Sequence, residues 1–320
     1  MGIVLRLVGV LLMLTALALT LSRAPDRAVS TLVARWAPPP SEFVEIKGQL
    51  VHYRDEGPRS NGTDGPPPIV LIHGTSASLH TWEGWVKALK AQRRVITFDL
   101  PGFGLTGPFA GQYEAGNYSG DAYARFVVDL LDALKVDRAV LGGNSLGGEV
   151  AWRTAYLAPP RVAALVLVDA AGPPFVPESM PLGFRMARIP VLNRISEVAL
   201  PRALVEEGVK SVYGDPSKVT PELVDRYFEL TLREGNREAL RLRMQHLVAG
   251  EHAERIATLK QPTLILWGGR DKLIPPEIAQ QFHRQIAGSQ LVLFQDLGHV
   301  PQEEDPARSV QPVKAFLGLK

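Results

Sequence analysis

The chain has 320 residues, of which 46% are hydrophobic, with 35 Lys and Arg against 33 Asp and Glu and no cysteine. This composition excludes wholesale disorder, disulfides, thiolate metal clusters and a cysteine nucleophile. A formal net charge of +2, without a basic cluster interleaved with aromatic residues, gives no support to nucleic-acid binding.

The first predicted element is an apolar helix at residues 3–22, in which Arg6 is the only charge. Twenty helical residues rise about 30 Å, roughly the thickness of the hydrocarbon layer of a bilayer. A cleaved signal peptide, a signal anchor and a buried helix are the three interpretations. The apolar run continues past the only tidy cleavage motif, at residues 16–18, which favours the anchor. We therefore expect residues 1–23 to tether the protein to a membrane, or to direct its export if they are cleaved.

Residues 24–41 follow this segment and contain Arg35, Trp36 and a run of three prolines at 38–40. Proline-rich sequence is typical of a stiff connection and not of a folded element. We expect a linker here and a folded core that begins near residue 42.

Short apolar segments alternate with helical patterns from residue 42 onward. Most of these segments are apolar at every position, as in the strands of a parallel sheet that is covered on both faces. The predicted strands occupy residues 43–46, 50–53, 69–72, 95–98, 139–141, 162–168, 263–267 and 291–294. The alternation predicts an α/β fold in which helices flank a mostly parallel central sheet.

Residues 172–257 interrupt this alternation. They begin with a proline-rich passage and continue as helical patterns without a convincing strand. We expect them to form a helical cap, inserted between two strands and lying over the carboxyl edge of the sheet, where α/β sheets bind ligands. The core would then comprise residues 42–171 and 258–320.

The pentapeptide at residues 143–147, Gly-Asn-Ser-Leu-Gly, has the G-x-S-x-G pattern between a predicted strand and a predicted helix. Such a sharp turn forces Ser145 into a strained backbone and lifts its hydroxyl above the sheet, and glycine neighbours let the turn close. The alternative is an ordinary glycine-rich loop. The strand-helix context favours Ser145 as a catalytic nucleophile.

A serine nucleophile needs a base to take its proton, and the base needs an acid to orient it. Of seven histidines, His299 directly follows the last predicted strand and reaches the same sheet edge as Ser145. Asp271 follows the strand at 263–267 at that edge, and Asp169 is the competing candidate for the acid. We predict a triad of Ser145, His299 and Asp271.

Two backbone N–H groups should hold the oxyanion that develops at the attacked carbonyl. Leu146, directly after the nucleophile, supplies one. The loop after the strand at 69–72 supplies the other, and we assign it to Thr75 because Gly74 lets the backbone approach the substrate. His73 and Asp99 are expected to order their own loops.

Taken together, these motifs resemble those of a serine hydrolase of the α/β-hydrolase superfamily. The matching pieces, in family order, are His73-Gly74, residues 99–104, residues 143–148, residues 268–271 and Gly298-His299. The resemblance implies the α/β-hydrolase fold with the order nucleophile, acid, base along the chain. Haloalkane dehalogenases and epoxide hydrolases share this layout but use an aspartate nucleophile, so Ser145 argues against both.

Residues 144–148 are similar to the elbow of carbon–carbon bond hydrolases that act on ring-cleavage products, although the loop at 75–78 departs from their glycine-rich loop. The leading hypothesis is a carboxylesterase or lipase-like enzyme that needs no metal or organic cofactor. It would cleave small esters with a hydrophobic acyl or alcohol group, near a membrane. The alternatives are a carbon–carbon bond hydrolase, an acyltransferase on the same triad, or a catalytically silent binding protein with this fold.

Overall fold

A computed structural model of the chain describes residues 2–59, 65–187, 189 and 199–320. At its centre is an eight-stranded sheet in the order β1-β2-β4-β3-β5-β6-β7-β8. The strands are β1 (Glu42–Ile46), β2 (Gln49–Glu56), β3 (Ile69–Ile72), β4 (Val95–Phe98), β5 (Ala139–Asn144), β6 (Val162–Val168), β7 (Thr263–Gly268) and β8 (Gln290–Phe294). Pairings of β2 with β1 and β4 are antiparallel and the other pairings are parallel. The predicted α/β fold with a mostly parallel sheet is confirmed.

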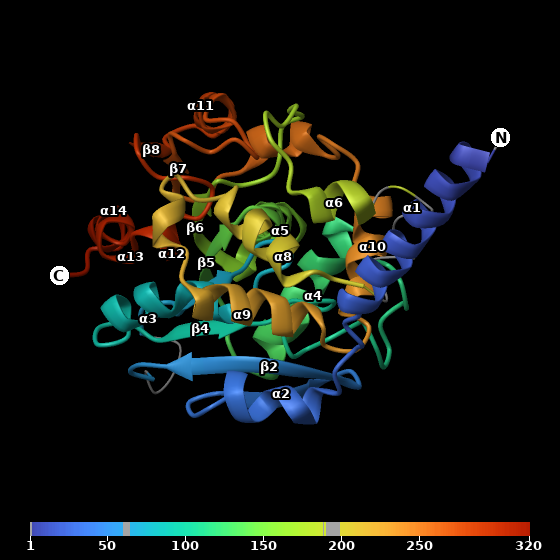
Figure 1. Cartoon of the computed structure of the whole chain (residues 1–320). Coiled ribbons are helices and arrows are strands. Elements are labelled where there is room, and N and C mark those ends of the chain that lie inside the picture. Colours follow the sequence, from blue (N-terminus) through green and yellow to red (C-terminus); the bar gives the residue numbers. More distant parts are fainter. Residues whose placement is uncertain (1, 60–64, 188, 190–198) are drawn as a thin grey trace.

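Helices cover both faces of the sheet, which explains why the central strands are apolar at every position. In β3, Val70 and Ile72 pack into one hydrophobic cluster, while Ile69 and Leu71 pack into another on the opposite face. The first cluster includes side chains of α4 (Gly120–Ala133), α5 (Leu146–Leu157) and α11 (Glu277–Gln285). The second includes side chains of η1 (Leu79–Trp82), α3 (Glu83–Leu89) and α14 (Gln311–Phe316). Figure 1 shows this layered arrangement.

Between β6 and β7 the described residues contribute helices and no strand to the sheet. We call four of them the cap helices: α6 (Leu182–Ala187), α8 (Arg202–Lys210), α9 (Pro221–Thr231) and α10 (Asn236–His246). The short turns η3 (Pro216–Lys218) and η4 (Ala253–Thr258) complete this part, and η2 (Pro159–Arg161) precedes β6. In Figure 1, α8 and α9 pass in front of the sheet. The division into a cap at 172–257 and a core around it stays a prediction.

A largely buried ion-pair network joins α10 to α4 and α5. Arg243 of α10 reaches Glu149 of α5 at 2.8 Å, and Glu149 also accepts a hydrogen bond from Arg153 at 2.9 Å. Arg153, which is 1% exposed, further pairs with Asp121 of α4 and with Glu251, each at 2.8 Å. Removing one partner from a buried network leaves an uncompensated charge, which typically costs about 3–5 kcal/mol. The network therefore fixes α10 against the helix that follows Ser145.

The segment predicted as a linker contains a folded element. Helix α2 (Val29–Trp36) packs Leu32 and Trp36 against Leu105 and Leu230, and the Trp36 indole donates a hydrogen bond to Glu229 at 2.7 Å. The prolines that led to the linker prediction lie after this helix. They end α2 without preventing its apolar face from being buried.

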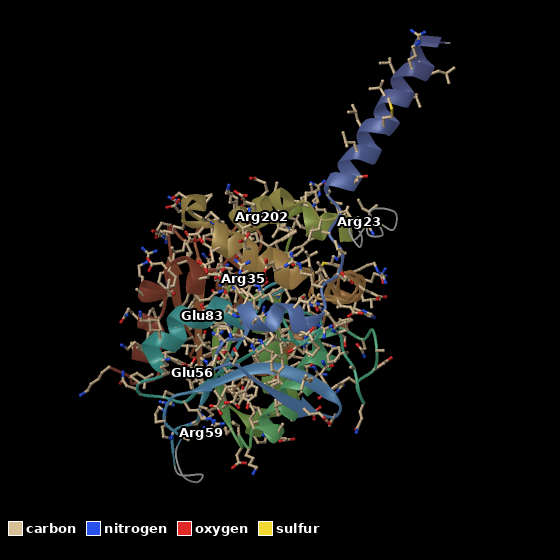
Figure 2. The ribbon with its side chains drawn as sticks, turned by 60° about the horizontal axis from the view of Figure 1, so that its bottom comes forward. Arg23, Arg35, Glu56, Arg59, Glu83 and Arg202 are labelled. Atoms are coloured by element: carbon tan, nitrogen blue, oxygen red, sulfur yellow. The ribbon has the colours of Figure 1, made fainter. Side chains whose placement is uncertain are left out.

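The apolar segment at the N-terminus forms helix α1 (Gly2–Leu21). Figure 2 shows α1 projecting away from the rest of the molecule, with Arg23 at its base. No helix among the described residues combines the length and the apolar character needed to cross a bilayer. The predicted localisation, a membrane anchor at 3–22 or export after its cleavage, is therefore wrong.

Candidate active site

The strand-to-helix turn at Ser145 has the strained geometry that its sequence predicts. Ser145 lies between β5 and α5 with φ 56° and ψ −117°, outside the regions that ordinary residues prefer. A Cβ atom at Gly147 would lie 2.0 Å from the carbonyl oxygen of Ile72, and one at Gly143 would lie 2.1 Å from that of Gly147. Only glycine fits at both positions, so the spacing of G-x-S-x-G follows directly from how tightly this turn packs.

His299 and Asp271 form a buried pair at the neighbouring strand ends. Nδ1 of His299 lies 2.6 Å from Oδ2 of Asp271, and both residues are less than 5% exposed. Oδ1 of Asp271 accepts hydrogen bonds from the backbone N–H groups of Leu273, at 2.8 Å, and Ile274, at 3.0 Å. Because Asp271 is held by its own loop and engages Nδ1, Nε2 is the ring nitrogen that remains for proton exchange with a substrate.

Asn144 and Glu304 support the histidine loop, and sequence reasoning missed both roles. Asn144 Nδ2 donates a hydrogen bond to the carbonyl oxygen of His299 at 2.9 Å. Glu304, in α12 (Pro301–Glu304), accepts from the backbone N–H of Gly298 at 2.8 Å and from that of Gly214 at 2.9 Å. Asn144 stands inside the elbow motif, where it could have been noticed. Glu304 carries no signal of its own in the sequence.

Ser145 and His299 line the same cavity, of about 170 Å³, together with Asn144 and Thr75. Gly74 lies against the elbow, because a Cβ atom there would lie 3.1 Å from the Cβ of Ser145. This contact places the backbone after Gly74 beside the serine. Leu146 is the first residue of α5, where backbone N–H groups have no partner within the helix. The predicted oxyanion residues Thr75 and Leu146 therefore flank Ser145, and their role stays a prediction.

The rest of the cavity wall is mostly apolar, with Ser76, Tyr227 and Thr231 as polar members, and the cap helices contribute a large share of it. Its apolar side chains are those of Ala77, Pro181, Phe184, Leu200, Leu204, Val205, Val209, Val212, Leu240, Leu273 and Val300. Among the lining residues that the structure describes, none is Lys or Arg, and His299 and Tyr227 are the ones with titratable side chains.

Asp169, the competing candidate for the acid, lies beside the pair, whereas the 2.6 Å contact to the imidazole comes from Asp271. Its Oδ1 accepts a hydrogen bond from the backbone N–H of Gly268 at 2.9 Å. Asp169, Asp271 and His299 each have one potential metal-ligand atom, a carboxylate oxygen or a ring nitrogen, within 4.8 Å of the others. This spacing could suit a metal ion. The 2.6 Å contact between Asp271 and His299 occupies the facing atoms, so we assign this cluster to hydrogen bonding.

A second group of buried imidazoles lies around Asp99. Oδ2 of Asp99 lies 2.7 Å from Nδ1 of His52, and Oδ1 accepts from the backbone N–H of Leu79 at 2.8 Å. His73 donates from Nδ1 to the carbonyl oxygen of Gly74 and accepts at Nε2 from Leu100 N–H. These contacts order the two loops and need a neutral His73, whose pKa burial lowers.

His80 is likewise held neutral. Its Nε2 donates to the carbonyl oxygen of Trp36 at 2.8 Å, and its Nδ1 accepts from the hydroxyl of Ser78 at 2.9 Å. Burial lowers the pKa of His80 from 6.5 to about 3. As the pH falls below 6.5, the unfolded chain binds a proton here that the folded chain does not. The stability contribution is complete above pH 6.5 and is lost progressively towards pH 3.

We therefore expect His80→Gln to flatten the pH dependence of stability, by up to about 1.4 kcal/mol per pH unit between pH 6 and pH 4. Urea unfolding of the wild type and the variant at several pH values measures this slope. His246→Gln, at an exposed position of α10, is the matched control and should leave the slope unchanged. Equal slopes in the wild type and His80→Gln would contradict the prediction.

A family model described as the alpha/beta hydrolase fold matches residues 67–306. The chain belongs to the α/β-hydrolase family. This membership confirms the resemblance predicted from the motifs, and it supports a hydrolase activity.

Curated relatives of this α/β-hydrolase carry several activities. The dihydrolipoyllysine-residue acetyltransferase component of the acetoin cleaving system of Pseudomonas putida is 31% identical over 282 residues, 87% of this chain and 70% of that protein. The 2-hydroxy-6-oxo-2,4-heptadienoate hydrolase of Pseudomonas putida is 30% identical over 267 residues, 79% of this chain and 90% of that protein.

Solved structures show the same spread. A meta-cleavage product hydrolase from Pseudomonas fluorescens superimposes with a TM-score of 0.71 at 27% identity, covering 87% of this chain and 97% of that one. A thermophilic esterase from Thermogutta terrifontis superimposes with a TM-score of 0.69 at 26% identity, covering 87% and 98%. Both a carbon–carbon bond hydrolase and an esterase are thus similar to this chain to nearly the same degree.

Proposed function

We propose that this α/β-hydrolase is a serine hydrolase that cleaves uncharged carboxylic esters with a hydrophobic acyl or alcohol group. The observation that carries the proposal is one cavity that combines Ser145 and His299 with an apolar wall. The contact between His299 and Asp271 supports the triad, because it leaves Nε2 to exchange protons at the serine side.

The proposed reaction uses groups of this chain only. Nε2 of His299 takes the proton of the Ser145 hydroxyl as the oxygen attacks the ester carbonyl. The N–H groups of Leu146 and Thr75 would hold the oxyanion of the tetrahedral intermediate. His299 then gives the proton to the departing alcohol, which leaves an acyl-enzyme. Water attacks this acyl-enzyme with His299 again as base, releasing the acid and restoring Ser145. An alcohol in place of water would give acyl transfer.

The charge of the cavity wall favours a neutral ester over a carboxylate-bearing substrate. A buried carboxylate needs a cationic or strongly hydrogen-bonding partner, because desolvation disfavours its charged form. The described wall offers no Lys or Arg for this purpose. Apolar side chains such as Phe184, Leu204 and Val209 instead stabilise a bound hydrophobic group, because water is excluded from the contact. This stabilisation is about 25 cal/mol per Å² of apolar area buried.

The second candidate is a carbon–carbon bond hydrolase, and the relatives favour it. One relative is named for a heptadienoate, a substrate with a carboxylate group. On this alternative, Ser145 and His299 would act on a ketone next to the bond that breaks. The two candidates differ in what they require of the wall, since the dienoate carries a charge that the neutral ester lacks.

A substrate comparison tests the choice. The purified protein is assayed with neutral p-nitrophenyl esters of increasing acyl length, with an ester of matched length that ends in a carboxylate, and with a ring-cleavage dienoate. We expect kcat/KM to rise with acyl length until the cavity is full, and the charged ester to be poorer by about 10²-fold or more. Leu204→Lys places a cation in the wall and should narrow this difference.

Leu50→Lys, at an exposed position of β2, is the matched control for the added charge and should leave the ratio unchanged. Faster cleavage of the dienoate than of every neutral ester would overturn the ester proposal in favour of the second candidate. If neither class is cleaved and a fluorophosphonate probe does not react with Ser145, both candidates fail.

A further inference from the structure

A second carboxyl group lies behind the proposed acid, in a position that the reaction described above does not use. Asp169 directly follows β6 and is fully buried. Its Oδ1 accepts from Gly268 N–H at 2.9 Å. Its Oδ2 is also buried, and no donor among the described residues reaches it. The carboxyl of Asp271 lies next to it, because one carboxylate oxygen of each residue lies within 4.8 Å of the other.

Two neighbouring carboxylates accept hydrogen bonds but cannot donate one, so they can bond to each other only if one of them carries a proton. In a buried site, two adjacent negative charges cannot both persist. Asp271 already accepts from two backbone N–H groups and faces His299 at 2.6 Å, which stabilises its charged form. Asp169 has a single N–H donor. The proton therefore belongs on Asp169.

The other charged groups around Asp169 agree with this assignment. Burial and the charge of Asp271 raise the pKa of Asp169 well above its ordinary value, and Glu304 adds a smaller contribution in the same direction. Among the described residues, His299 is a further titratable neighbour: one of its ring nitrogens lies within 4.8 Å of a carboxylate oxygen of Asp169, and its Nδ1 contacts Asp271 directly.

We propose that Asp169 is a positioning residue that stays protonated and donates a hydrogen bond to the carboxylate of Asp271. The inference rests on the proposed triad, which it deepens. The bond would fix the orientation of Asp271 and spread part of its negative charge away from the imidazole. Asp169 thus acts on His299 only through Asp271.

The site makes asparagine an informative replacement. In Asp169→Asn the side-chain amide would keep the acceptor for Gly268 and supply an N–H donor to Asp271, as the protonated acid does. Asparagine also tolerates the left-handed backbone at this position, where φ is 44°. Asp169→Ala removes both the donor and the acceptor. Asp137→Asn, at an exposed position, is the control for the chemical change itself.

The experiment measures kcat, KM and the pH profile of kcat/KM for a neutral ester in the full-length wild type and the three variants. We expect Asp169→Asn to keep kcat within about threefold and the midpoint of the acidic limb within about 0.3 pH unit. We expect Asp169→Ala to lower kcat about tenfold or more, the loss that matches one hydrogen bond to a charged group. The midpoint of the acidic limb of its pH profile should move to higher pH. Without Asp169, the negative charge of Asp271 is no longer shared through a hydrogen bond and stabilises the imidazolium of His299 more strongly.

Three results would overturn the proposal. If Asp169 is charged in the wild type, Asp169→Asn removes a negative charge and lowers the acidic midpoint by about one pH unit. If Asp169→Ala behaves as the wild type, the residue has no positioning role. If Asp169→Ala loses kcat without any change of midpoint, its role is structural only.

Infrared difference spectra of the wild type against Asp169→Asn give a readout that does not depend on activity or on the folding of the alanine variant. The proposal expects the wild type to show the carbonyl stretch of a protonated carboxyl near neutral pH, and its absence would contradict the proposal. This readout separates the inference from the proposed function, because loss of activity in Ser145→Ala tests only the latter.

Discussion

Ser145→Ala is expected to lower kcat for neutral esters by about 10⁵- to 10⁶-fold, because the nucleophilic oxygen is lost and no acyl-enzyme can form. The fold should be unaffected. Ser145 stands at the N-cap of α5, yet its side chain makes no capping hydrogen bond, so alanine leaves no backbone donor newly unpaired. The assay is steady-state hydrolysis of a p-nitrophenyl ester, with circular dichroism to show that the variant is folded.

Ser217→Ala, in the exposed turn η3, is the matched control and should retain wild-type kcat. Labelling with a fluorophosphonate probe gives an independent readout, since only an activated serine reacts. Unchanged hydrolysis or labelling in Ser145→Ala would remove the basis of the proposed function.

Asp271→Asn is expected to lower kcat by about 10⁴-fold, the loss that the same change produces in other Ser-His-Asp enzymes. The carbonyl oxygen of asparagine can still accept from Leu273 and Ile274, so the loop should keep its shape. The amide N–H would then face Nδ1 of His299 and favour the wrong tautomer, and the imidazolium would lose its counter-charge. KM should change little, because Asp271 does not line the cavity.

The control for this change is Asp296→Asn, on the exposed loop that follows β8, where Asp296 pairs with Arg308 at 2.7 Å. Surface ion pairs contribute about 0–1 kcal/mol, so this variant should retain wild-type kcat. A loss in Asp271→Asn no larger than in Asp296→Asn would show that Asp271 is not the acid of a triad.

The sequence was sufficient for those parts of the site that depend on chain order and local sterics. Gly143 and Gly147 have no room for a Cβ atom, so their spacing around Ser145 is a direct imprint of the turn. Asp271 follows β7, which is buried throughout, and His299 follows β8, an apolar edge strand that is partly buried. Since carboxyl ends of neighbouring parallel strands meet at one edge, proximity followed from topology alone.

Other features depended on packing between distant segments, which no local pattern specifies. The prolines at 38–40 suggested a linker, whereas α2 is held by Leu230 and Glu229, from a cap helix far along the chain. The sequence prediction considered Asp169 only as a rival of Asp271 for the role of the acid. The pairing of β6 with β7 in the sheet brings Asp169 and Asp271 together. The apolar segment at 3–22 predicted a membrane anchor, which the helices of the described residues do not support.

The hydrogen bonds of the His299 loop divide the cap into regions that protein engineers should treat differently. The carbonyl oxygen of Val212 accepts from His299 N–H at 2.8 Å, and the carboxylate of Glu304 bridges Gly298 to Gly214. Redesign of residues 212–214 to change selectivity would therefore also displace His299, the proposed general base, and should reduce turnover. Phe184 and Leu204 line the same cavity from α6 and α8, without hydrogen bonds from their side chains to the histidine loop. Libraries that alter acyl-chain preference should begin there.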